Sequence, residues 1–505
     1  MPMPDKYLKK ILTSHVYDVA HETPLEPAPL LSKRTGNTVF LKREDEQPVF
    51  SFKIRGAYNK MAGLPREVLK RGVICASAGN HAQGVAFAAQ RLKTKAIVVM
   101  PRTTPEIKVN AVRNYGARVV LHGDNYDAAW EHAKGICEQK QMTFIHPFDD
   151  PDVIAGQGTI GFEILKQHPQ ELEAVFVPVG GGGLISGIGA YIKALRPEIK
   201  VIGVEAEDCD AMEKSLTAGK RIMLDHVNTF VDGTAVRQVG SETFRLAKQV
   251  IDEVIVVSND EVCAAIKDIF EDRRSILEPA GALAMAGLKA WVAKHKVKNR
   301  DLVVIASGAN VNFDRLRHVA ERAEVGERRE AVLAVTIPEK PGSFKKFCAT
   351  IGNRGITEFN YRYDDPAQAH IFVGVQIHDQ KEEKQLMSAL RKHGYKPVDM
   401  TDNEMAKLHI RHMVGGHATN AIDEIVYRFM FPERPGALMN FLNTMGRRWN
   451  ISLFHYRNHG ADFGRVLVGM QVPMNEKKEF KEFLDRLGYD YTEETGNPAY
   501  KLFLG

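Results

Sequence analysis

Four consecutive glycines, Gly180 to Gly183, stand between two apolar stretches of the chain. Residues 174–178 before them have the length and composition of a buried strand, and residues 184–188 after them begin a helical pattern. Glycines let the backbone turn sharply and leave its N–H groups uncovered. Because the N-terminus of a helix also attracts anions, such donors bind a phosphate group. The run therefore predicts a phosphate site on a strand–turn–helix unit.

The chain from residue 39 to residue 319 alternates short β-branched runs with amphipathic helical stretches. Short apolar strands separated by helices form parallel sheets that helices cover on both faces. We therefore expect an α/β fold for this part, with ligands bound where strands end and helices begin. The expected strands are residues 73–76, 96–100, 119–121, 175–179, 201–204, 254–257 and 302–306, and the expected helices include residues 81–89, 107–115 and 128–138.

After about Glu330 the sequence contains an internal repeat. The repeated pairs of segments are 337–347 with 431–441, 356–362 with 451–457, and 372–376 with 467–471. Each copy has the order strand, helix, strand, strand, helix, strand, which is typical of ferredoxin-like α+β domains. We expect a large domain made of two α/β subdomains at residues 1–329. Two small α+β domains should follow at residues 330–403 and 425–505, joined by a linker at residues 404–424.

The linker carries His409, His412 and His417. His409 and His412 would share one helix face, an arrangement also found in metal sites. The linker has no cysteine, and no acidic fourth ligand follows at a fixed spacing. We therefore expect a solvated linker helix and no metal.

The balance of charges limits the classes of partner. The chain has 68 basic and 63 acidic residues, a net charge of +5, and the two signs are interspersed. This pattern favours neither nucleic acid nor an anionic membrane, and no apolar run reaches membrane-spanning length. The five cysteines form no Cys-x-x-Cys pair, which is typical of reduced thiols in a reducing compartment. We expect a cytoplasmic protein.

Three further motifs fall where an expected strand ends or a helix begins. Residues 51–56 read Ser-Phe-Lys-Ile-Arg-Gly, residues 77–81 read Ser-Ala-Gly-Asn-His, and residues 307–310 read Ser-Gly-Ala-Asn. Each motif has an ordinary interpretation when it is taken alone. Lys53 suits a surface lysine, Asn80 a helix cap, and Ser307 a polar group that ends a strand.

The combination of these motifs favours one cofactor. A lysine among hydrophobic residues can have a lowered pKa and form a Schiff base. Such a lysine together with a phosphate site points to pyridoxal phosphate. The alternative is a dinucleotide site, since Glu205 and Glu207 end a strand at about the expected distance after the glycines. That alternative requires spaced glycines and leaves Lys53 and Asn80 unexplained.

These motifs, together with Glu278-Pro279-Ala280-Gly281, resemble those of the serine/threonine dehydratases, which are fold-type II pyridoxal-phosphate enzymes. They occur in the family's order through the whole large domain. The two repeats resemble the paired ACT-like regulatory domains of the family's biosynthetic members, so the resemblance covers nearly the full chain. It implies an α/β catalytic domain of the tryptophan synthase β type at residues 1–329, followed by two ACT-like domains.

The resemblance implies a role for each cofactor-binding residue. Lys53 would bind the cofactor aldehyde as a Schiff base and then act as the base on the substrate α-proton. Phe52 would lie against the cofactor ring, Asn80 would bond its 3-hydroxyl, and Ser307 would face its pyridine nitrogen. A hydroxyl there leaves that nitrogen largely unprotonated, which suits β-elimination. The phosphate would be bound by the backbone N–H groups of Gly180, Gly181, Gly182, Gly183 and Leu184.

The resemblance also implies the substrate site and the reaction. The substrate carboxylate would bind at the helix start formed by Ser77, Ala78, Gly79, Asn80 and His81. In the similar serine racemases a second serine stands at the position of Ala78 and acts as an acid/base. Alanine cannot transfer a proton, so we expect little racemisation. The implied reaction converts L-threonine to 2-oxobutanoate and ammonia, the first step of isoleucine biosynthesis, with L-serine as a second candidate substrate.

Three interpretations of the repeats and of the whole chain stay open. The resemblance implies feedback by isoleucine or valine through the repeats, and a homotetramer. The repeats could instead serve only in oligomerisation, because Tyr361, Phe454 and Tyr456 suit a core or an interface as well as an effector pocket. The chain could also be an amino-acid-binding regulator that has lost turnover, but the intact Lys53, glycine run and Ser307 argue against this.

Overall fold

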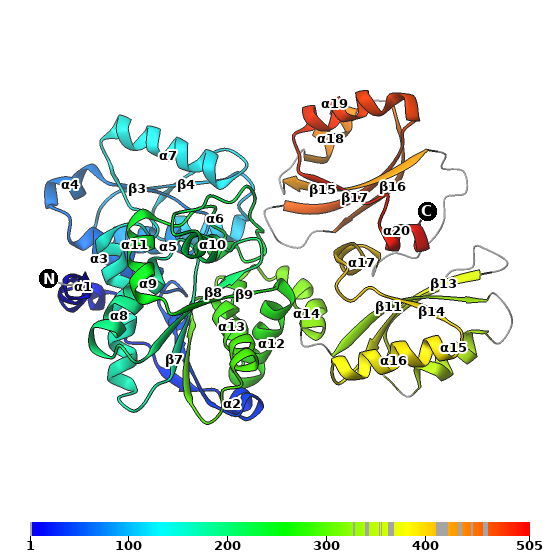
Figure 1. The fold of residues 1–505 in the computed structure, drawn as a ribbon. Helices are drawn as coiled ribbons and strands as arrows, with labels where there is room; N and C mark the ends of the chain where they lie inside the picture. The colour runs from blue at the N-terminus through cyan, green and yellow to red at the C-terminus, as the bar shows by residue number, and fades with distance from the viewer. Residues whose placement is uncertain are drawn as a thin grey trace. The chain divides into compact units, whose positions relative to one another are not determined.

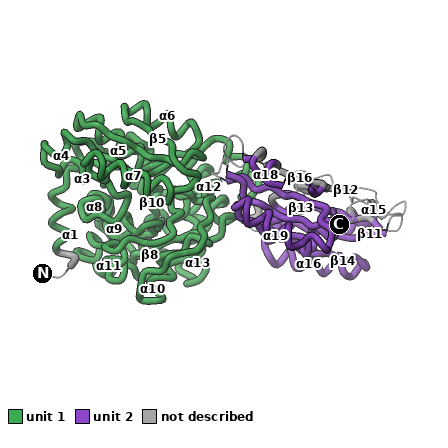
Figure 2. Tube along the Cα trace, turned by 90° about the horizontal axis from the view of Figure 1, so that it is seen from above, with its two compact units in different colours: residues 1–323 green, residues 324–505 purple. Residues whose placement is uncertain are grey.

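The computed structural model divides the chain into two compact units, unit 1 (residues 1–323) and unit 2 (residues 324–505) (Figure 1, Figure 2). It describes residues 3–326, 329–338, 343–352, 354, 356–361, 368–410, 423–432, 437–445, 448–457 and 463–504. Unit 1 carries two largely parallel sheets, and unit 2 carries two antiparallel sheets.

The larger sheet of unit 1 has six strands, and all but the first run parallel. In spatial order they are β1 (Leu25–Pro27), β2 (Thr38–Arg43), β10 (Asp301–Ala306), β7 (Ala174–Pro178), β8 (Lys200–Ala206) and β9 (Glu253–Val257). Along β7, Ala174 and Phe176 join the hydrophobic core on one face, and Val175 and Val177 join the core on the other. Since successive side chains point to opposite faces, this sheet is buried on both sides.

The smaller sheet of unit 1 has four parallel strands. In spatial order they are β5 (Arg118–Leu121), β4 (Ala96–Met100), β3 (Val73–Ala76) and β6 (Thr143–Phe144). Every strand expected from the sequence is present, with ends that differ by two residues at most. The sequence does not predict β1, β2 and β6, because β1 and β6 are short and β2 ends in Lys42 and Arg43.

Helices lie on both faces of these sheets (Figure 1). The core on one face of the larger sheet includes residues of α12 and α13, and the core on the other face includes residues of α8, α9 and α11. The α-helices that begin in unit 1 are α1 (Met3–Leu12), α2 (Pro29–Thr35), α3 (Lys53–Ala62), α4 (Arg66–Arg71), α5 (Asn80–Arg91), α6 (Glu106–Asn114), α7 (Tyr126–Lys140), α8 (Pro151–Gln167), α9 (Gly183–Leu195), α10 (Ala211–Ala218), α11 (Ser241–Val250), α12 (Asn259–Arg273), α13 (Pro279–His295) and α14 (Arg315–Gly326).

Unit 2 contains two copies of one fold, each with a four-stranded antiparallel sheet. The first sheet has the order β12 (Ile356–Tyr361), β13 (Gln368–Gln376), β11 (Glu330–Pro338), β14 (Lys396–Asp399), with helices α15 (Ser343–Ile351) and α16 (Gln380–Lys392). The second has the order β16 (Asn450–Arg457), β17 (Phe463–Gln471), β15 (Glu424–Pro432), β18 (Tyr491–Glu493), with α18 (Ala437–Met445) and α19 (Lys477–Leu487). The order of elements predicted for each repeat is confirmed.

The two copies share a hydrophobic core within unit 2. This core draws on both sheets and on two short helices, α17 (Glu404–Leu408) and α20 (Pro498–Phe503). Phe503 of α20 packs edge-on against Phe372 of β13, with ring centres 5.6 Å apart. The last helix of the second repeat thus contacts the sheet of the first.

His409 corrects the expectation of a solvated linker helix. It follows α17 and is fully buried. Its neighbours Met405 and Ile410 belong to the shared core, so this part of the linker has an apolar side to bury. His412 and His417 lie outside the described residues.

Candidate active site

Lys53 is the first residue of α3 and follows a segment that pairs with the chain just after β10. Ser51 forms an antiparallel bridge with Gly308, and the N–H of Phe52 donates to the carbonyl oxygen of Ser307 at 3.2 Å. These main-chain contacts bring together the lysine motif and the Ser-Gly-Ala-Asn motif, although the two lie far apart in the sequence.

The amine of Lys53 lies between a backbone carbonyl group and an aromatic ring. Its Nζ donates to the carbonyl oxygen of Pro147 at 2.9 Å and lies 5.2 Å from the centre of the Phe52 ring. Burial lowers the pKa of Lys53 to about 8, and the negative charge of Glu278 opposes that shift. About half of the amine is then neutral near pH 8, as a nucleophile or a base requires. Lys53 is therefore no ordinary surface lysine.

The four glycines form the turn between β7 and α9. Gly182 has a φ of 91°, which disfavours any residue with a Cβ. A Cβ at Gly181 would lie 2.2 Å from the ring of Phe148, and one at Gly180 would lie 2.9 Å from neighbouring backbone. Among the described residues, no acceptor pairs with the backbone N–H groups of residues 180–184. The turn thus presents uncovered donors at the start of α9, as an anion site requires.

One short segment borders both the lysine and the glycine turn. Pro147 accepts the hydrogen bond from Lys53, and the next residue, Phe148, packs on Gly181 and Gly183. Neighbouring residues of one segment thus contact the lysine amine and the glycine turn, which suits a molecule that carries both an aldehyde and a phosphate.

Asn80 and Ser307 both donate hydrogen bonds to the Glu-Pro-Ala-Gly segment. Oδ1 of Asn80 accepts from Nδ2 of Asn310 at 2.7 Å, and its Nδ2 donates to Oε1 of Glu278 at 2.5 Å. The hydroxyl of Ser307 donates to the carbonyl oxygen of Ala280 at 3.1 Å. The structure therefore brings together three of the motifs and the Glu-Pro-Ala-Gly segment.

Residues 77–79 connect β3 to α5, and Asn80 and His81 are the first two residues of that helix. The N–H of Gly79 donates to Oγ of Ser77 at 3.2 Å, and Nε2 of His81 lies 2.9 Å from the carbonyl oxygen of Ile145. Burial lowers the pKa of His81 to about 3, so its ring is neutral at physiological pH. Among the described residues, no acceptor pairs with the first N–H groups of α5. A carboxylate here would meet backbone donors and no charged imidazole.

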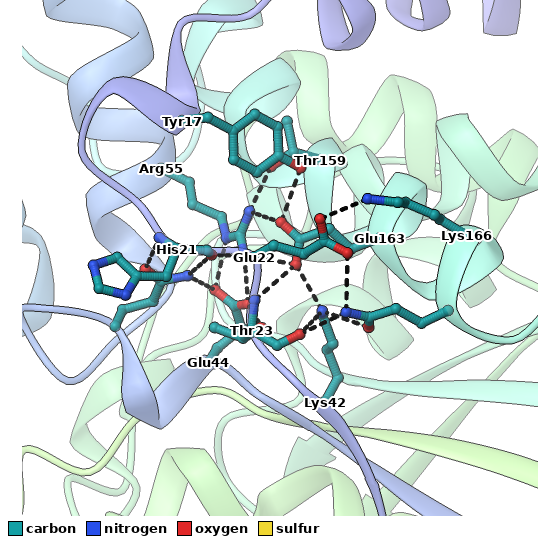
Figure 3. Close-up of polar contacts among 12 residues, drawn as sticks. Tyr17, His21, Glu22, Thr23, Lys42, Glu44, Arg55, Thr159, Glu163 and Lys166 are labelled. Atoms are coloured by element: carbon teal, nitrogen blue, oxygen red, sulfur yellow. Dashed lines mark hydrogen bonds and ion pairs between the residues drawn. The ribbon is translucent and has the colours of Figure 1, made fainter.

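The sequence does not predict a buried charge network beside the lysine. Arg55, two residues after Lys53, forms ion pairs with Glu44 and Glu163, and Nζ of Lys42 lies 2.6 Å from Glu163 (Figure 3). None of the four charged side chains is exposed. Two positive and two negative charges offset one another, and together they tie α3 to β2 and α8. The signal that the sequence offers is Lys42 directly after the apolar residues 39–41, at the start of a run of charged residues.

Two family models match the chain. The model described as "Pyridoxal-phosphate dependent enzyme" matches residues 16–308, and the model described as "C-terminal regulatory domain of Threonine dehydratase" matches residues 321–410 and 415–504. The chain is also 60% identical over 501 residues to the "L-threonine dehydratase biosynthetic IlvA" of Burkholderia multivorans, and 99% of each chain is covered. The chain belongs to the biosynthetic threonine dehydratases.

Other proteins similar to this dehydratase agree with the assignment. The biosynthetic IlvA of Escherichia coli is 53% identical over 500 residues, 99% of this chain and 97% of the relative. The solved structure of the processed form of threonine deaminase isoform 2 from Solanum lycopersicum matches with a TM-score of 0.63 and 52% identity, over 64% of this chain and 88% of that one. The cofactor of this dehydratase is therefore pyridoxal phosphate, and the predicted fold-type II fold with C-terminal regulatory domains is confirmed.

The dinucleotide alternative is wrong for this dehydratase. Glu205 accepts from the N–H groups of Met212 and Glu213 at 2.9 and 2.8 Å, and Glu207 accepts from the N–H of Asn259 at 3.1 Å. Both carboxylates bind the backbone at helix starts, so neither stands ready to bind a ribose.

Membrane spans and metal clusters are absent from the described part of the dehydratase. None of the helices described there is long and apolar enough to cross a membrane. Within the same residues, no group of three or more histidine, cysteine, aspartate or glutamate side chains is placed to hold a metal ion.

Proposed function

We propose that this chain removes water from L-threonine by β-elimination and so begins isoleucine biosynthesis. The enamine that is released takes up water again and hydrolyses to 2-oxobutanoate and ammonia. The observation that carries the proposal is the position of the Lys53 amine. The amine donates to the carbonyl oxygen of Pro147, and the next residue, Phe148, packs on the glycine turn. Burial lowers the pKa of the amine, so part of it is neutral. Full-length identity to threonine dehydratases supports the substrate. L-serine is the second candidate substrate, since one methyl group changes selectivity modestly.

When bound, pyridoxal phosphate supplies an aldehyde that attaches amines and a ring that withdraws electrons from the substrate α-carbon. Lys53 would hold the cofactor and then remove the α-proton, because its lowered pKa leaves neutral amine available. Phe52 would lie against the ring, and Asn80 would donate to the ring 3-oxygen. The hydroxyl of Ser307 would turn from Ala280 toward the ring nitrogen. The phosphate would be bound by the N–H groups of Gly180, Gly181, Gly182, Gly183 and Leu184.

The substrate carboxylate would bind at the start of α5. The proposed residues are Ser77, Ala78, Gly79, Asn80 and His81, and His81 would contribute its backbone because its ring faces Ile145. Ala78 has no proton to deliver to the opposite face of the α-carbon. The side chain at this position therefore favours elimination over racemisation.

Regulation would reside in unit 2. We propose regulatory domains at residues 330–403 and 425–505, joined by residues 404–424 and attached to a catalytic domain at residues 1–329, with isoleucine and valine as effectors. The match to a regulatory domain of threonine dehydratase supports this assignment. The side chains of Tyr361, Phe454 and Tyr456 lie outside the described part of the chain. A homotetramer in the cytoplasm completes the proposal. Cys75, Cys137 and Cys209 form no disulfide, which suits a reducing compartment.

The catalytic part of the proposal is tested with Lys53→Ala. This variant should lose the visible absorption band of bound cofactor, and kcat for threonine should fall by at least about a thousandfold. Lys70→Ala, at an exposed lysine of α4, is the matched control and should keep both properties. Wild-type deamination by Lys53→Ala would refute the assignment. A wild-type protein that binds no cofactor would favour the amino-acid-binding regulator.

The regulatory part is tested by comparing the full chain with a chain that ends before Glu330. A solved structure of about this size exists among similar proteins: a threonine deaminase from T.th. matches over 61% of this chain and 98% of its own, with 38% identity and a TM-score of 0.57. The shortened chain should deaminate threonine and ignore isoleucine, whereas isoleucine should inhibit the full chain. Two results together would favour a role of the repeats in oligomerisation alone. The full chain would not respond to isoleucine or valine, and the shortened chain would have a lower oligomeric state.

A further inference from the structure

Glu278 is a buried carboxylate for which the proposed reaction has no assigned use. It stands at the N-terminal end of α13 and is 4% exposed, yet its side chain does not cap that helix. Its Oε1 instead accepts the hydrogen bond from Nδ2 of Asn80. A Cβ at Gly308 would lie 2.5 Å from the same oxygen, so the glycine there makes room for the carboxyl group. The carboxyl group is therefore directed into the site and away from its own helix.

The charged groups around Glu278 come from several elements. Asp232, in the 3₁₀ turn Asp232–Thr234, is paired with Lys108 of α6 at 2.6 Å and with Arg315 of α14 at 3.3 Å. Asp232 offsets only one of these two cations, so the three residues present a net positive charge to Glu278. The amine of Lys53 is a further cation near Glu278. The backbone N–H of Glu278 donates to the carbonyl oxygen of Gly308 at 3.2 Å, and Gly308 pairs with Ser51, two residues before Lys53. The other titratable neighbours of the amine are His81 and His146. Both imidazoles are kept neutral because burial lowers their pKa values, so Glu278 is the charged neighbour that matters most to the amine.

The hydrogen bonds of Asn80 define which way its carboxamide points. Asn310 donates to Oδ1, and Nδ2 donates to Glu278. A carboxamide nitrogen has two N–H groups, so one remains for a ligand. If Glu278 did not accept one N–H group, the carboxamide of Asn80 would lose the hydrogen bond that fixes the direction of the other N–H group.

We infer that Glu278 is a positioning residue of the active site: its carboxyl group orients the carboxamide of Asn80 toward the cofactor, and its charge sets the proton affinity of the Lys53 amine. The first half of the inference rests on the proposed role of Asn80, and the second half requires neither cofactor nor turnover.

The protonation states of the two residues are coupled. Burial raises the pKa of Glu278 to about 7, and burial lowers the pKa of Lys53 to about 8. An ionised Glu278 favours the ammonium form of Lys53, because opposite charges stabilise each other in a site of low dielectric constant. Removing that charge should therefore make the amine neutral at lower pH.

The first experiment measures the Lys53 amine directly, in the full chain freed of cofactor. Lys53 is labelled with acetic anhydride over a range of pH, and the extent of labelling is read by mass spectrometry. In Glu278→Gln the midpoint of labelling should move down by about one pH unit. Glu278→Asp, which keeps the charge, should stay closer to the wild type. Glu205→Gln, at a buried carboxylate that binds the start of α10, is the matched control and should leave the midpoint unchanged.

The second experiment measures cofactor affinity in the same variants. Glu278→Gln still offers Asn80 an oxygen acceptor and should bind pyridoxal phosphate nearly as the wild type does. Glu278→Leu offers none and should bind it at least about tenfold more weakly, a loss equal to one hydrogen bond. Equal labelling midpoints in all variants would refute the electrostatic role, and equal affinities would refute the orienting role. Failure of the threonine assay alone would count against the proposed function and leave both measurements valid.

Discussion

Arg55 and Glu163 are joined by two hydrogen bonds, from Nη1 to Oε1 at 2.5 Å and from Nη2 to Oε2 at 3.0 Å, although neither side chain is exposed. Arg55 also donates to both carboxylate oxygens of Glu44 at 2.7 Å. Every polar atom of the guanidinium is thus used inside the protein. Since Arg55 lies two residues after Lys53, this network holds the first turn of α3 in place.

Arg55→Met should strongly destabilise the protein. The change leaves two buried carboxylates with one remaining cation, Lys42, and breaking such a buried pair costs about 3–5 kcal/mol. Denaturant unfolding at pH 7.5 provides the measurement. Lys70→Ala removes an ion pair whose side chains are 72% and 77% exposed and should change stability by less than about 1 kcal/mol. An equally small loss in Arg55→Met would show that the network does not stabilise unit 1.

Gly181→Ala should weaken cofactor binding. The new Cβ would overlap the ring of Phe148, and relieving that overlap must move either the ring or the turn. Overpacking of this kind costs about 1–3 kcal/mol, which corresponds to about a 5- to 150-fold rise in Kd if the cost falls on the bound state. Titration of the visible cofactor band checks this.

Gly135→Ala is the matched control for the turn. Gly135 lies within α7, and a Cβ there meets nothing within 4 Å. The substitution should leave the Kd unchanged and stabilise the helix by about 0.5–1 kcal/mol. Equal Kd values in the two variants would contradict the assignment of the glycine turn to the phosphate.

His81 should make the fold sensitive to acid. Its pKa lies at about 3 in the folded chain, against an ordinary value of 6.5, because burial opposes the charged form. Below pH 6.5 the unfolded chain binds a proton that the folded chain does not, so stability is complete above pH 6.5 and falls as the pH drops toward 3. The loss at pH 4.5 should be about 2–3 kcal/mol.

His81→Gln should flatten that dependence. Glutamine has no group that titrates between pH 3 and 6.5, and its amide can donate to the carbonyl oxygen of Ile145 in place of the ring. Urea unfolding of both proteins at pH 7.5, 6.0 and 4.5 measures the difference in slope. Parallel curves for the two proteins would show that His81 titrates normally in the fold.

The elements of unit 1 could be predicted because their signals are local. The strands at Val73–Ala76 and Ala96–Met100 are apolar runs between polar segments, and their ends agree with the prediction. The contact between Asn80 and Glu278 joins residues 198 positions apart, and no local pattern records it. The packing of Phe148 on Gly181 is likewise invisible in the sequence, because it depends on how two sheets are placed around the site.

The burial of His409 could not be predicted for a related reason. The segment after Thr401 carries charges and three histidines, which is typical of a solvated linker. His409 is fully buried, and the shared core that includes its neighbours Met405 and Ile410 draws on both repeats, so this core exists only once the two have packed together. A pattern read along one segment does not contain that information.

Phe503→Ala should uncouple the two repeats. Phe503, in the last helix of the second repeat, packs against Phe372 of the first repeat, and its side chain is 5% exposed. Removing such a ring costs about 3–5 kcal/mol of the packing in unit 2, while the residues that we propose for catalysis all belong to unit 1. Deamination without effector should therefore persist, and the isoleucine concentration for half inhibition should rise. Met474→Ala, at a 70% exposed side chain of the same unit, should leave inhibition unaltered. If Phe503→Ala left the isoleucine response intact, the contact between the repeats would have no part in regulation.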